Sequence, residues 1–224
     1  MNYNLEIGEY NEILRYELIN SLIRKNHYKS YLEIGVSYGE SFNNIVCDEK
    51  VGVDPDPNSA ATVHMTSDDY FAHIPDDKKF DMIFIDGLHE WHTCYRDIVN
   101  SIRHLSPNGT IVCHDMNPIC EVWIDIDNLN RGGAWTGDVF KTLVEIRSTR
   151  NDVEAALLFD TDMGIGIIRH KQLSNPPVSC DIDNLTYEEW VSNKQYLSGC
   201  IPYEVFEQNF LHDDYFLHNL AEFN

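Results

Sequence analysis

The sequence predicts an α/β protein whose doubly wound, mostly parallel sheet ends in an antiparallel hairpin. Between residues 9 and 148, short apolar runs that suit buried strands alternate with segments of helical periodicity. Residues 153–171 differ, because two apolar runs stand only a few polar residues apart and leave no room for a helix. Such a pair forms a hairpin, so the sheet is expected to close with one antiparallel strand.

The predicted parallel strands are short apolar runs that end at turn-forming or polar residues. The strongest is KFDMIFIDGLH, because its apolar run stands between a charged start and a glycine. In chain order the predicted strands are SYLEIGV (30–36), KVGVDPDP (50–57), ATVHMTS (61–67), KFDMIFIDGLH (79–89) and TIVCHD (110–115).

The predicted helices place apolar residues three and four positions apart, so that each has one buried face. In the helix over 93–105, for example, Tyr95, Ile98 and Ile102 share one face. In chain order the helices are EYNEILRYELINSLIRK (9–25), SFNNIVCDE (41–49), DDYFAHIPD (68–76), TCYRDIVNSIRHL (93–105) and GDVFKTLVEIRS (137–148).

The chain divides into three parts. Its 224 residues suffice for one well-buried α/β domain and are too few for two large ones. We expect an N-terminal helical segment over residues 1–27 and a core over 28–171. Residues 172–224 are acidic and rich in aromatic residues, which predicts a helical extension that packs on the sheet or on a partner.

Composition excludes several classes of function. The formal net charge of −21 repels phosphate backbones, so no nucleic-acid partner is expected. No apolar stretch approaches the length of a membrane span, and the N-terminus lacks the features of a signal peptide. The six cysteines show no C-x-x-C spacing, which is typical of reduced thiols. We therefore expect a cytoplasmic protein without a membrane partner. The sequence leaves open whether the protein forms a homo-oligomer.

The segment Gly35-Val36-Ser37-Tyr38-Gly39 admits two interpretations. It fits G-x-S-x-G, the turn that carries the nucleophile of a serine hydrolase. That turn normally follows several strands and needs an upstream glycine-rich oxyanion loop, whereas here only one helix comes before the first strand. The dinucleotide motif G-x-G-x-x-G also fails, because Ser37 and Glu40 stand at its glycine positions.

The pattern that does hold is E-x-G-x-x-x-G, formed by Glu33, Gly35 and Gly39. Asp54 follows Gly35 by 19 residues, at the end of the second predicted strand, where an acid meets the ribose hydroxyls of a nucleotide cofactor. The two glycines allow the cofactor to approach the backbone closely. The Glu33 carboxylate disfavours a pyrophosphate and suits a cationic, amine-bearing ligand such as S-adenosylmethionine, which has no phosphate.

Four segments together resemble the class I S-adenosylmethionine-dependent methyltransferases over about residues 28–170. They are YLEIGVSYGES (31–41), VGVDPDP (51–57), FDMIFIDGLHEWHTCYRDIVNSIRHLSPNGTIVCHDMNP (80–118) and WTGDVFKTLVEIR (135–147). The last two resemble a branch of small O-methyltransferases associated with glycan and natural-product tailoring. The resemblance implies a Rossmann-like seven-stranded sheet with helices on both faces and a methyl transfer to a hydroxyl oxygen.

The resemblance also implies a set of donor-binding residues. Ser67 and Asp68 stand where the family recognises adenine, although SDDY could equally begin a helix. The expected contacts of S-adenosylmethionine are Glu33, Gly35, Ser37, Gly39, Asp54, Ser67, Asp68 and Asp86.

A second cluster carries the chemistry. IDGLHEWH and CHDMNP end two predicted parallel strands, so their polar residues are expected to meet in the crevice at the carboxyl edge of the sheet. One interpretation is a divalent metal that orients a substrate hydroxyl and lowers its pKa. The other is a metal-free acid–base site with histidine as proton acceptor. The residues concerned are Asp86, His89, His92, His114, Asp115 and Asn117.

This cluster resembles that of the metal-dependent catechol-type methyltransferases. The match places Asp86 and Asp115 as metal ligands and His89 as the base. It departs at Met116, where the family has asparagine, so His114 or Asn117 would supply the third ligand. We expect Mg²⁺ or Mn²⁺ at Asp86, Asp115 and His114, with His89, His114 and Asp115 as catalytic residues.

Several other polar residues in this region have plainer interpretations. His92 and His104 are expected to be ordinary surface or loop histidines. Asp97 would pair with Arg96 or Arg103.

The acceptor is expected to be a small molecule or a carbohydrate. Residues 130–141, NRGGAWTGDVFK, follow the fifth predicted strand and offer glycines for movement and Trp135 for stacking on a sugar. The alternative for this segment is a loop in which Trp135 only packs. For the whole chain the predicted function is O-methylation of a hydroxyl, most naturally of a sugar. The alternatives are an N-methyltransferase and a non-catalytic partner subunit with the same fold.

Overall fold

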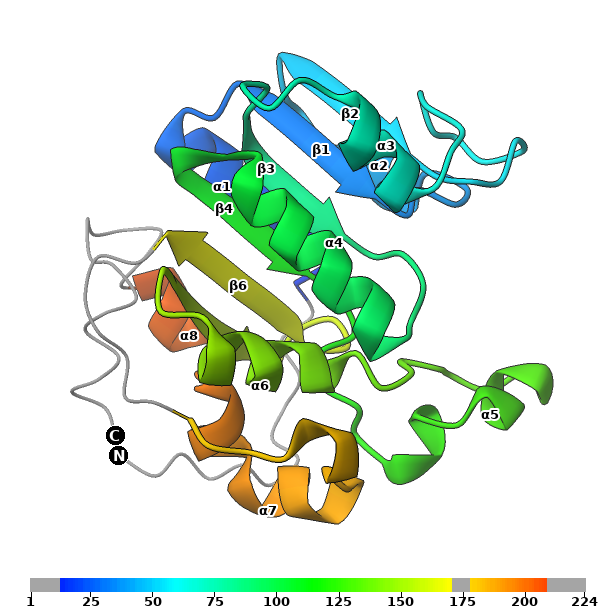
Figure 1. Cartoon of the computed structure of the whole chain (residues 1–224), viewed down its shortest axis with the longest axis vertical. Helices are drawn as coiled ribbons and strands as arrows, with labels where there is room; N and C mark the ends of the chain where they lie inside the picture. The colour runs from blue at the N-terminus through cyan, green and yellow to red at the C-terminus, as the bar shows by residue number, and fades with distance from the viewer. Residues whose placement is uncertain (1–12, 171–177, 209–224) are drawn as a thin grey trace.

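The computed structural model describes residues 13–170 and 178–208, which fold around one twisted sheet (Figure 1). The strand order in this sheet is β2-β1-β3-β4-β6-β5. Strands β1 to β4 are parallel, as predicted, and each carries a mostly buried apolar run. The strands are β1 (Ser30–Ile34), β2 (Glu49–Val53), β3 (Phe80–Ile85), β4 (Leu105–Cys113), β5 (Val153–Leu158) and β6 (Ile165–His170).

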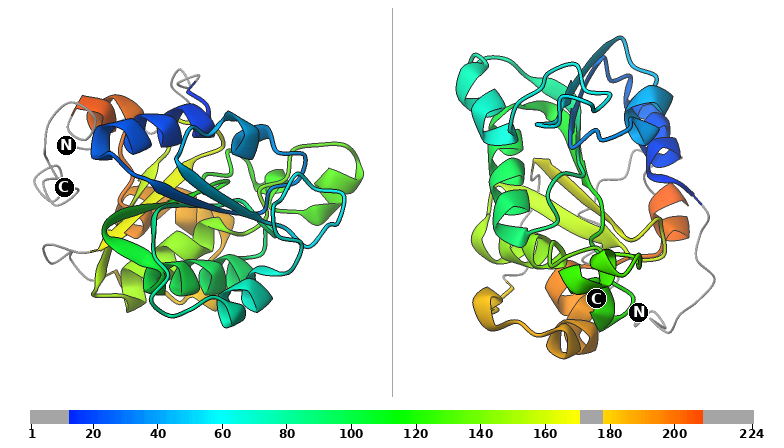
Figure 2. Two further views of the ribbon diagram at one scale, coloured as in Figure 1. Left: turned by 90° about the horizontal axis from the view of Figure 1, so that it is seen from above. Right: turned by 90° about the vertical axis from the view of Figure 1, so that its right-hand side faces the viewer.

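Helices cover both faces of the sheet, as expected (Figure 2). One face is covered by α1 (Arg15–Asn26), α2 (Glu40–Asn44) and α8 (Tyr203–Phe206), whose buried side chains form one hydrophobic cluster with the sheet. The other face is covered by α3 (Ser67–His73), α4 (Trp91–Arg103), α6 (Phe140–Thr149) and α7 (Tyr187–Ser198). The short α5 (Ile126–Asn130) lies on an arm that projects from the body (Figure 1).

The N-terminal helix begins later than predicted. The sequence pattern starts at residue 9, whereas α1 begins at Arg15, and residues 9–12 lie outside the described part of the chain. The apolar face is as expected: Leu18, Ile19, Leu22 and Ile23 are buried against the sheet.

The prediction of a strand over 61–67 is wrong. This segment makes a single isolated bridge, in which Val63 pairs with Val53, and does not extend the sheet. Only the last residue of the segment, Ser67, is helical: Thr66 caps α3, since its side chain accepts a hydrogen bond from the amide of Asp69. The described residues therefore form a sheet of six strands, and the expected seventh strand is not found.

The predicted hairpin is confirmed. Strand β6 runs antiparallel to both β4 and β5 and lies between them, which makes it the antiparallel strand of the sheet. Met163 and Gly164 have positive φ angles of 55° and 81° in the connecting turn. This turn brings the polar residues of the loop to the same edge of the sheet as the end of β4, since the amide of Met116 bonds to the carbonyl of Gly164.

Residues 178–208 of the predicted extension pack on the chain's own core. Trp190 of α7 is fully buried, with its ring centroid 4.8 Å from that of Phe140 on α6. Ile201 forms a bridge with Leu158 at the edge of the sheet. The extension was expected to pack on the sheet or on a partner. Its described part packs on the sheet side of the chain's own core. No helix in the described residues is long and apolar enough to cross a membrane.

Candidate active site

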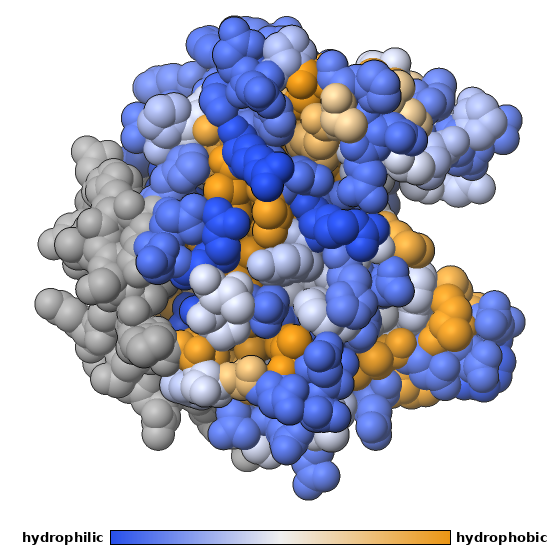
Figure 3. Space-filling model, viewed as in Figure 1, coloured by the Kyte–Doolittle hydropathy of each residue, from blue (hydrophilic) through white to orange (hydrophobic). Residues whose placement is uncertain are grey.

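A pocket of 860 Å³ lies at the carboxyl edge of the parallel strands. The surface is hollowed at this edge, between the segment that follows β2 and the arm that carries α5 (Figure 3). The glycine loop and the second cluster line the same pocket, so the structure brings most of the predicted site residues together. Its polar lining consists of Arg15, Glu33, Ser37, Tyr38, Glu40, Ser41, Asp54, Thr66, Ser67, Asp68, Asp86, His89, Thr93, Arg96, Asp97, His114 and Asp115.

Close approach of neighbouring loops requires both glycines of the loop after β1. Gly35 has a φ of +85°, and a Cβ there would lie 2.1 Å from the carbonyl oxygen of Asp86. Gly39 has a φ of +83°, and a Cβ there would lie 2.6 Å from the side chain of Asn43. Any side chain at either position would therefore displace protein atoms. The expected reason for these glycines was that they make room for the cofactor, whereas in the structure they make room for neighbouring parts of the protein.

Asp54 shapes this loop. One carboxylate oxygen accepts hydrogen bonds from the amides of Val36 (3.0 Å) and Ser37 (2.8 Å), and the other accepts one from Asp56 (2.9 Å). The carboxylate thus holds the turn in place while it lines the pocket at the end of β2.

Ser37 has the geometry of a loop residue. It has a φ of +48° and is exposed, and its amide is bound by Asp54. Within the described residues, its hydroxyl makes no hydrogen bond to a histidine, which a serine nucleophile needs as its base.

Glu33 is a buried carboxyl group at the floor of the pocket. It is 1% exposed and accepts a hydrogen bond from the Tyr31 hydroxyl. Burial raises the pKa of Glu33 to about 8, although the hydrogen bond from Tyr31 acts in the opposite direction. A cation placed beside this group would favour its ionised form.

Four side chains of the second cluster converge at the ends of β3 and β4. Nε2 of His89 lies 3.2 Å from Oδ2 of Asp115 and 3.6 Å from Oδ1 of Asp86. Nδ1 of His114 lies 3.1 Å from the same Asp115 oxygen and 3.4 Å from the same Asp86 oxygen. Asp115 has a φ of +60°, a conformation that aspartate tolerates better than most residues.

The charges in this cluster reinforce one another. Burial opposes the charged forms of Asp86, His89 and His114, but the opposite charges nearby outweigh it. The histidines hold the pKa of Asp86 well below its usual range. The nearby carboxylates raise the pKa of His89, and they raise that of His114 well above its ordinary value.

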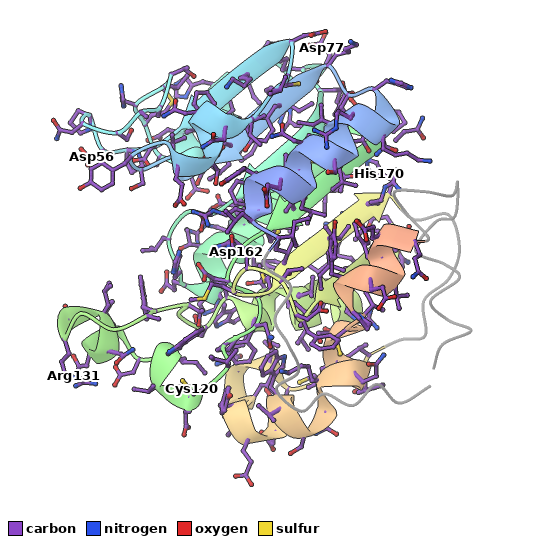
Figure 4. The ribbon with its side chains drawn as sticks, turned by 180° about the vertical axis from the view of Figure 1, so that it is seen from behind. Asp56, Asp77, Cys120, Arg131, Asp162 and His170 are labelled. Carbon is purple, nitrogen blue, oxygen red and sulfur yellow. The ribbon has the colours of Figure 1, made fainter. Side chains whose placement is uncertain are left out.

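Arg15 and Asp162 belong to the site, although neither is among the predicted site residues. The Arg15 guanidinium at the start of α1 lies 2.9 Å from Oδ2 of Asp162 and 3.7 Å from Oδ2 of Asp86. Oδ1 of Asp162 lies 3.4 Å from Nε2 of His114. Figure 4 shows Asp162 on the β5–β6 hairpin. The acidic motif Asp160-Thr161-Asp162 in the hairpin turn is the one signal in the sequence that could have indicated this residue.

Trp135 orients His89. The indole and imidazole rings are stacked with centroids 4.9 Å apart, and Nδ1 of His89 lies 3.0 Å from the carbonyl oxygen of Trp135. That carbonyl can only accept a hydrogen bond, so Nδ1 carries the proton and Nε2 faces the carboxylates. One face of Trp135 is thus occupied by His89, and only the other face is left for an acceptor.

Other predicted residues lie outside the cluster. The Asn117 side chain donates to the carbonyl of Phe159 (2.6 Å) and accepts from Lys194 (2.8 Å), so it does not supply the third ligand. His92 is exposed on α4, whereas His104 is 5% exposed and bonds to the carbonyl of Lys78, so the expectation of solvation is wrong for His104. Asp68 pairs with Arg96 at the pocket rim.

Among the residues that the structure describes, one group of side chains could hold a metal ion. Asp86, His114 and Asp115 each offer a ligand atom, and these atoms lie within 4.8 Å of one another. Two carboxylates and an imidazole suit Mn²⁺ or another transition ion better than Mg²⁺, which prefers oxygen ligands and retained water.

The central part of the chain is similar to a known domain. Residues 32–116 match the family model described as a methyltransferase domain. The matched range includes the glycine loop, Asp54 and the ends of β3 and β4. This match bears out the predicted enzyme class, an S-adenosylmethionine-dependent methyltransferase. No curated protein matches the chain.

Solved structures confirm the fold class. An O-methyltransferase from Bacillus cereus, in complex with SAH, has a TM-score of 0.54 and 14% sequence identity, over 73% of this chain and 84% of its own. An SAH-bound methyltransferase from Podospora anserina has a TM-score of 0.52 and 20% identity, over 73% and 81% of the two chains. At these identities the similarity shows the Rossmann-like α/β fold.

Proposed function

We propose that this methyltransferase transfers the methyl group of S-adenosylmethionine to a hydroxyl oxygen of a small-molecule acceptor. One observation carries the proposal: Glu33, Asp54 and the histidine–carboxylate cluster line a single pocket. A donor bound along the glycine loop would therefore present its methyl group beside groups that can accept a proton.

The pocket suits each part of the donor. Glu33 would bind the ammonium group, because an incoming cation offsets the cost of ionising this buried carboxyl group. Asp54 would meet the ribose hydroxyls at the end of β2, and Ser67 and Asp68 line the pocket near the expected position of the base. When bound, the donor supplies an activated methyl group, and the protein aligns it with the acceptor oxygen.

Arg15 and Ser41 would bind the donor's carboxylate. A guanidinium group has five N–H donors. Arg15 directs one each to Ser41, Asp162 and Glu40, which leaves two without a hydrogen-bond partner in the described structure. Both residues line the pocket together with Glu33. Glu33 would therefore face the ammonium group of the donor, while Arg15 and Ser41 would face its carboxylate.

His89 is the proposed proton acceptor. The carbonyl of Trp135 fixes the tautomer in which Nε2 faces the pocket. In the absence of a bound cation, Asp86 and Asp115 favour the protonated ring, which cannot act as a base. A divalent ion held by Asp86, Asp115 and His114 would neutralise this charge and lower the pKa of a nearby acceptor hydroxyl.

The acceptor is proposed to be a hydroxylated sugar, with a catechol as the second candidate. The half-buried ring of Trp135 on the arm and the exposed Gly132 near it support a sugar, because flat apolar rings stack on sugar faces. No feature of the described residues favours N-methylation or a non-catalytic subunit. The convergence of His89, Asp86 and Asp115 argues against a pure scaffold.

The experiment that tests the proposed function has two stages. Calorimetry should first detect binding of S-adenosylmethionine and no comparable binding of NAD. A panel of hydroxylated sugars, deoxyhexosides first, and catechols should then be screened for formation of S-adenosylhomocysteine, with and without Mn²⁺. Preferential binding of NAD would contradict the donor assignment. Donor binding without turnover on any hydroxyl, but with turnover on amines, would favour an N-methyltransferase.

A further inference from the structure

The turn between β5 and β6 holds the Asp162 carboxylate beside the end of β4. Two hydrogen bonds join the turn to the chain that follows β4: the amide of Met116 bonds to the carbonyl of Gly164 (2.9 Å), and the amide of Asn117 bonds to the carbonyl of Met163 (3.0 Å). Gly164 has a φ of +81°, and a Cβ there would lie 2.2 Å from the side chain of Asn117. The turn is therefore fitted closely to the segment that carries the polar cluster.

The two oxygens of Asp162 face different partners. Oδ2 accepts hydrogen bonds from the backbone amide of Arg15 (3.1 Å) and from its guanidinium group (2.9 Å). Oδ1 lies 3.4 Å from Nε2 of His114. The side chain of Asp162 is only 13% exposed. Arg15 thus fixes the carboxylate through one oxygen, and the other oxygen faces the imidazole.

His114 is buried with carboxylates on both sides of its ring. On the side away from Asp162, Nδ1 lies 3.1 Å from Oδ2 of Asp115 and 3.4 Å from Oδ1 of Asp86. Neither ring nitrogen makes a hydrogen bond within the described part of the chain, so these contacts are ionic. A buried polar atom normally has a partner, and the arrangement of Nδ1 with the two carboxylates suits a cation that all three groups bind.

A histidine that binds a metal ion through one nitrogen carries its proton on the other, and an acceptor almost always binds that N–H group. The acceptor orients the ring, and a carboxylate also makes the ligating nitrogen more basic. Asp162 lies where such an acceptor is needed, on the Nε2 side of His114. The other histidine of the cluster, His89, differs, because its Nδ1 faces a neutral carbonyl group.

We propose that Asp162 is a positioning residue, which binds the Nε2–H group of His114 and thereby makes Nδ1 the nitrogen that binds a divalent ion. The inference rests on the proposed function, in which Asp86 and Asp115 are the other ligands of this ion. It also assigns a preference to the site. An imidazole that is held in place favours Mn²⁺, Co²⁺ or Zn²⁺ over Mg²⁺, which prefers oxygen ligands.

Metal affinities separate this role from a purely structural one. Loss of the Asp162 charge affects all divalent ions alike, whereas loss of the His114 orientation affects mainly the ions that use the imidazole. We expect the unmodified protein to bind Mn²⁺ at least about tenfold more tightly than Mg²⁺. In Asp162→Ala the affinity for Mn²⁺ should fall by about 10- to 100-fold, the usual effect of removing such an acceptor. The affinity for Mg²⁺ should fall much less, so the preference for Mn²⁺ should largely disappear.

Two further variants sharpen the test. Asp162→Asn keeps an oxygen that can accept from the Nε2–H group, so it should retain more of the Mn²⁺ affinity than Asp162→Ala. Asp160→Asn is the matched control in the same turn. The Asp160 carboxylate binds the amide of Tyr203 (2.7 Å), which an asparagine oxygen can also do, so this variant should bind both ions as the unmodified protein does.

Calorimetric titration of Mn²⁺ and of Mg²⁺ into each donor-free protein gives these affinities. If Asp162→Ala lost affinity equally for both ions, Asp162 would act only through its charge or through the fold, and the proposal would be overturned. Unchanged affinities in this variant would overturn it as well.

A measurement on the unmodified protein covers the case in which the variants of Asp162 do not fold. Nitrogen NMR spectra of the Zn²⁺-loaded protein, labelled in its histidines, show which ring nitrogen binds the metal. We expect one histidine that is ligated through Nδ1 and carries its proton on Nε2. Ligation through Nε2 alone would overturn the proposal and would indicate His89, whose Nδ1 faces the carbonyl of Trp135.

The same titrations distinguish a failure of this inference from a failure of the donor site. If the unmodified protein bound neither Mn²⁺ nor Zn²⁺, the proposed metal site and the role of Asp162 would be wrong. Binding of S-adenosylhomocysteine by that protein would still support the proposed donor site, which does not depend on the ion.

Discussion

The imidazole of His89 lies between Asp115, whose Oδ2 is 3.2 Å from Nε2, and the carbonyl of Trp135, which is 3.0 Å from Nδ1. The ring therefore bridges the loop after β3, the end of β4 and the arm before α6. Its orientation depends on three separate segments, whereas its position in the sequence indicates only that it follows a strand.

Replacement of His89 by alanine should lower turnover by about 10² to 10⁴, the usual contribution of a general base. The affinity for S-adenosylhomocysteine should stay close to that of the unmodified protein, since the proposed donor contacts are elsewhere. Steady-state kinetics and calorimetry on the same preparation separate the two effects. His92→Ala is the matched control, because His92 is exposed on α4, and it should keep full activity. If His89→Ala kept full activity and His114→Ala lost it, the base would be His114 at the end of β4.

Asp115→Asn should abolish stimulation by Mn²⁺ without unfolding the protein. Asparagine tolerates the positive φ of 60° at this position, so the substitution removes the charge and keeps the backbone. A chelator should have the same effect on the unmodified protein, and direct titration of Mn²⁺ should show weaker binding to the variant. If the chelator did not affect activity but His89→Ala strongly lowered it, the metal assignment would be wrong and His89 would act as a base without a metal.

Arg15→Met should weaken binding of S-adenosylhomocysteine by about 10- to 100-fold, the range for a hydrogen bond to a charged group. Binding of 5′-methylthioadenosine, which lacks the amino-acid part, should hardly change. Calorimetry with the two ligands therefore distinguishes a carboxylate contact from a general disturbance of the pocket. Glu40→Gln is the control, because it removes the charge of an exposed partner of Arg15 and leaves the guanidinium in place. An equal loss for both ligands would assign Arg15 a purely structural role.

Glu33 should make the stability of the ligand-free protein depend on pH. Its pKa of about 8 in the folded protein exceeds the ordinary value of 4.5, so the protonated form stabilises the fold. This contribution is complete below about pH 4.5 and is lost as the pH rises through about 8, by on the order of a few kcal/mol. Chemical denaturation of the unmodified protein and of Glu33→Gln at about pH 5 and about pH 8 measures it. The difference between the two proteins should change with pH in this direction, and a constant difference would contradict the raised pKa.

The sequence predicted the features that depend on local pattern. The strands β1 to β4 and the hairpin are apolar runs bounded by glycine, proline or charged residues, and such runs are recognisable without the fold. The convergence of Asp86, His89 and Asp115 was predictable because the carboxyl ends of parallel strands meet at one edge.

The features that failed depend on tertiary context. The strand expected over 61–67 is reduced to one isolated bridge between Val53 and Val63, and the pairing of an edge segment is not determined by its own sequence. Asp97 has the sequence context of a helix-surface acid, and only its 2% exposure distinguishes it from one. Arg15 and Asp162 contact each other through the packing of α1 on the sheet and a hairpin turn, which no spacing rule relates.

The ion pair between Arg15 and Asp162 joins residues 147 positions apart. During synthesis α1 leaves the ribosome long before the hairpin, so the guanidinium lacks this carboxylate until the hairpin has been made. Strand β6, which lies between β4 and β5, is also missing at that stage, and the edge of β4 stays open for pairing with another chain. A nascent chain that stops before residue 162 should therefore aggregate or require a chaperone, although every residue that lines the pocket has been synthesised by then.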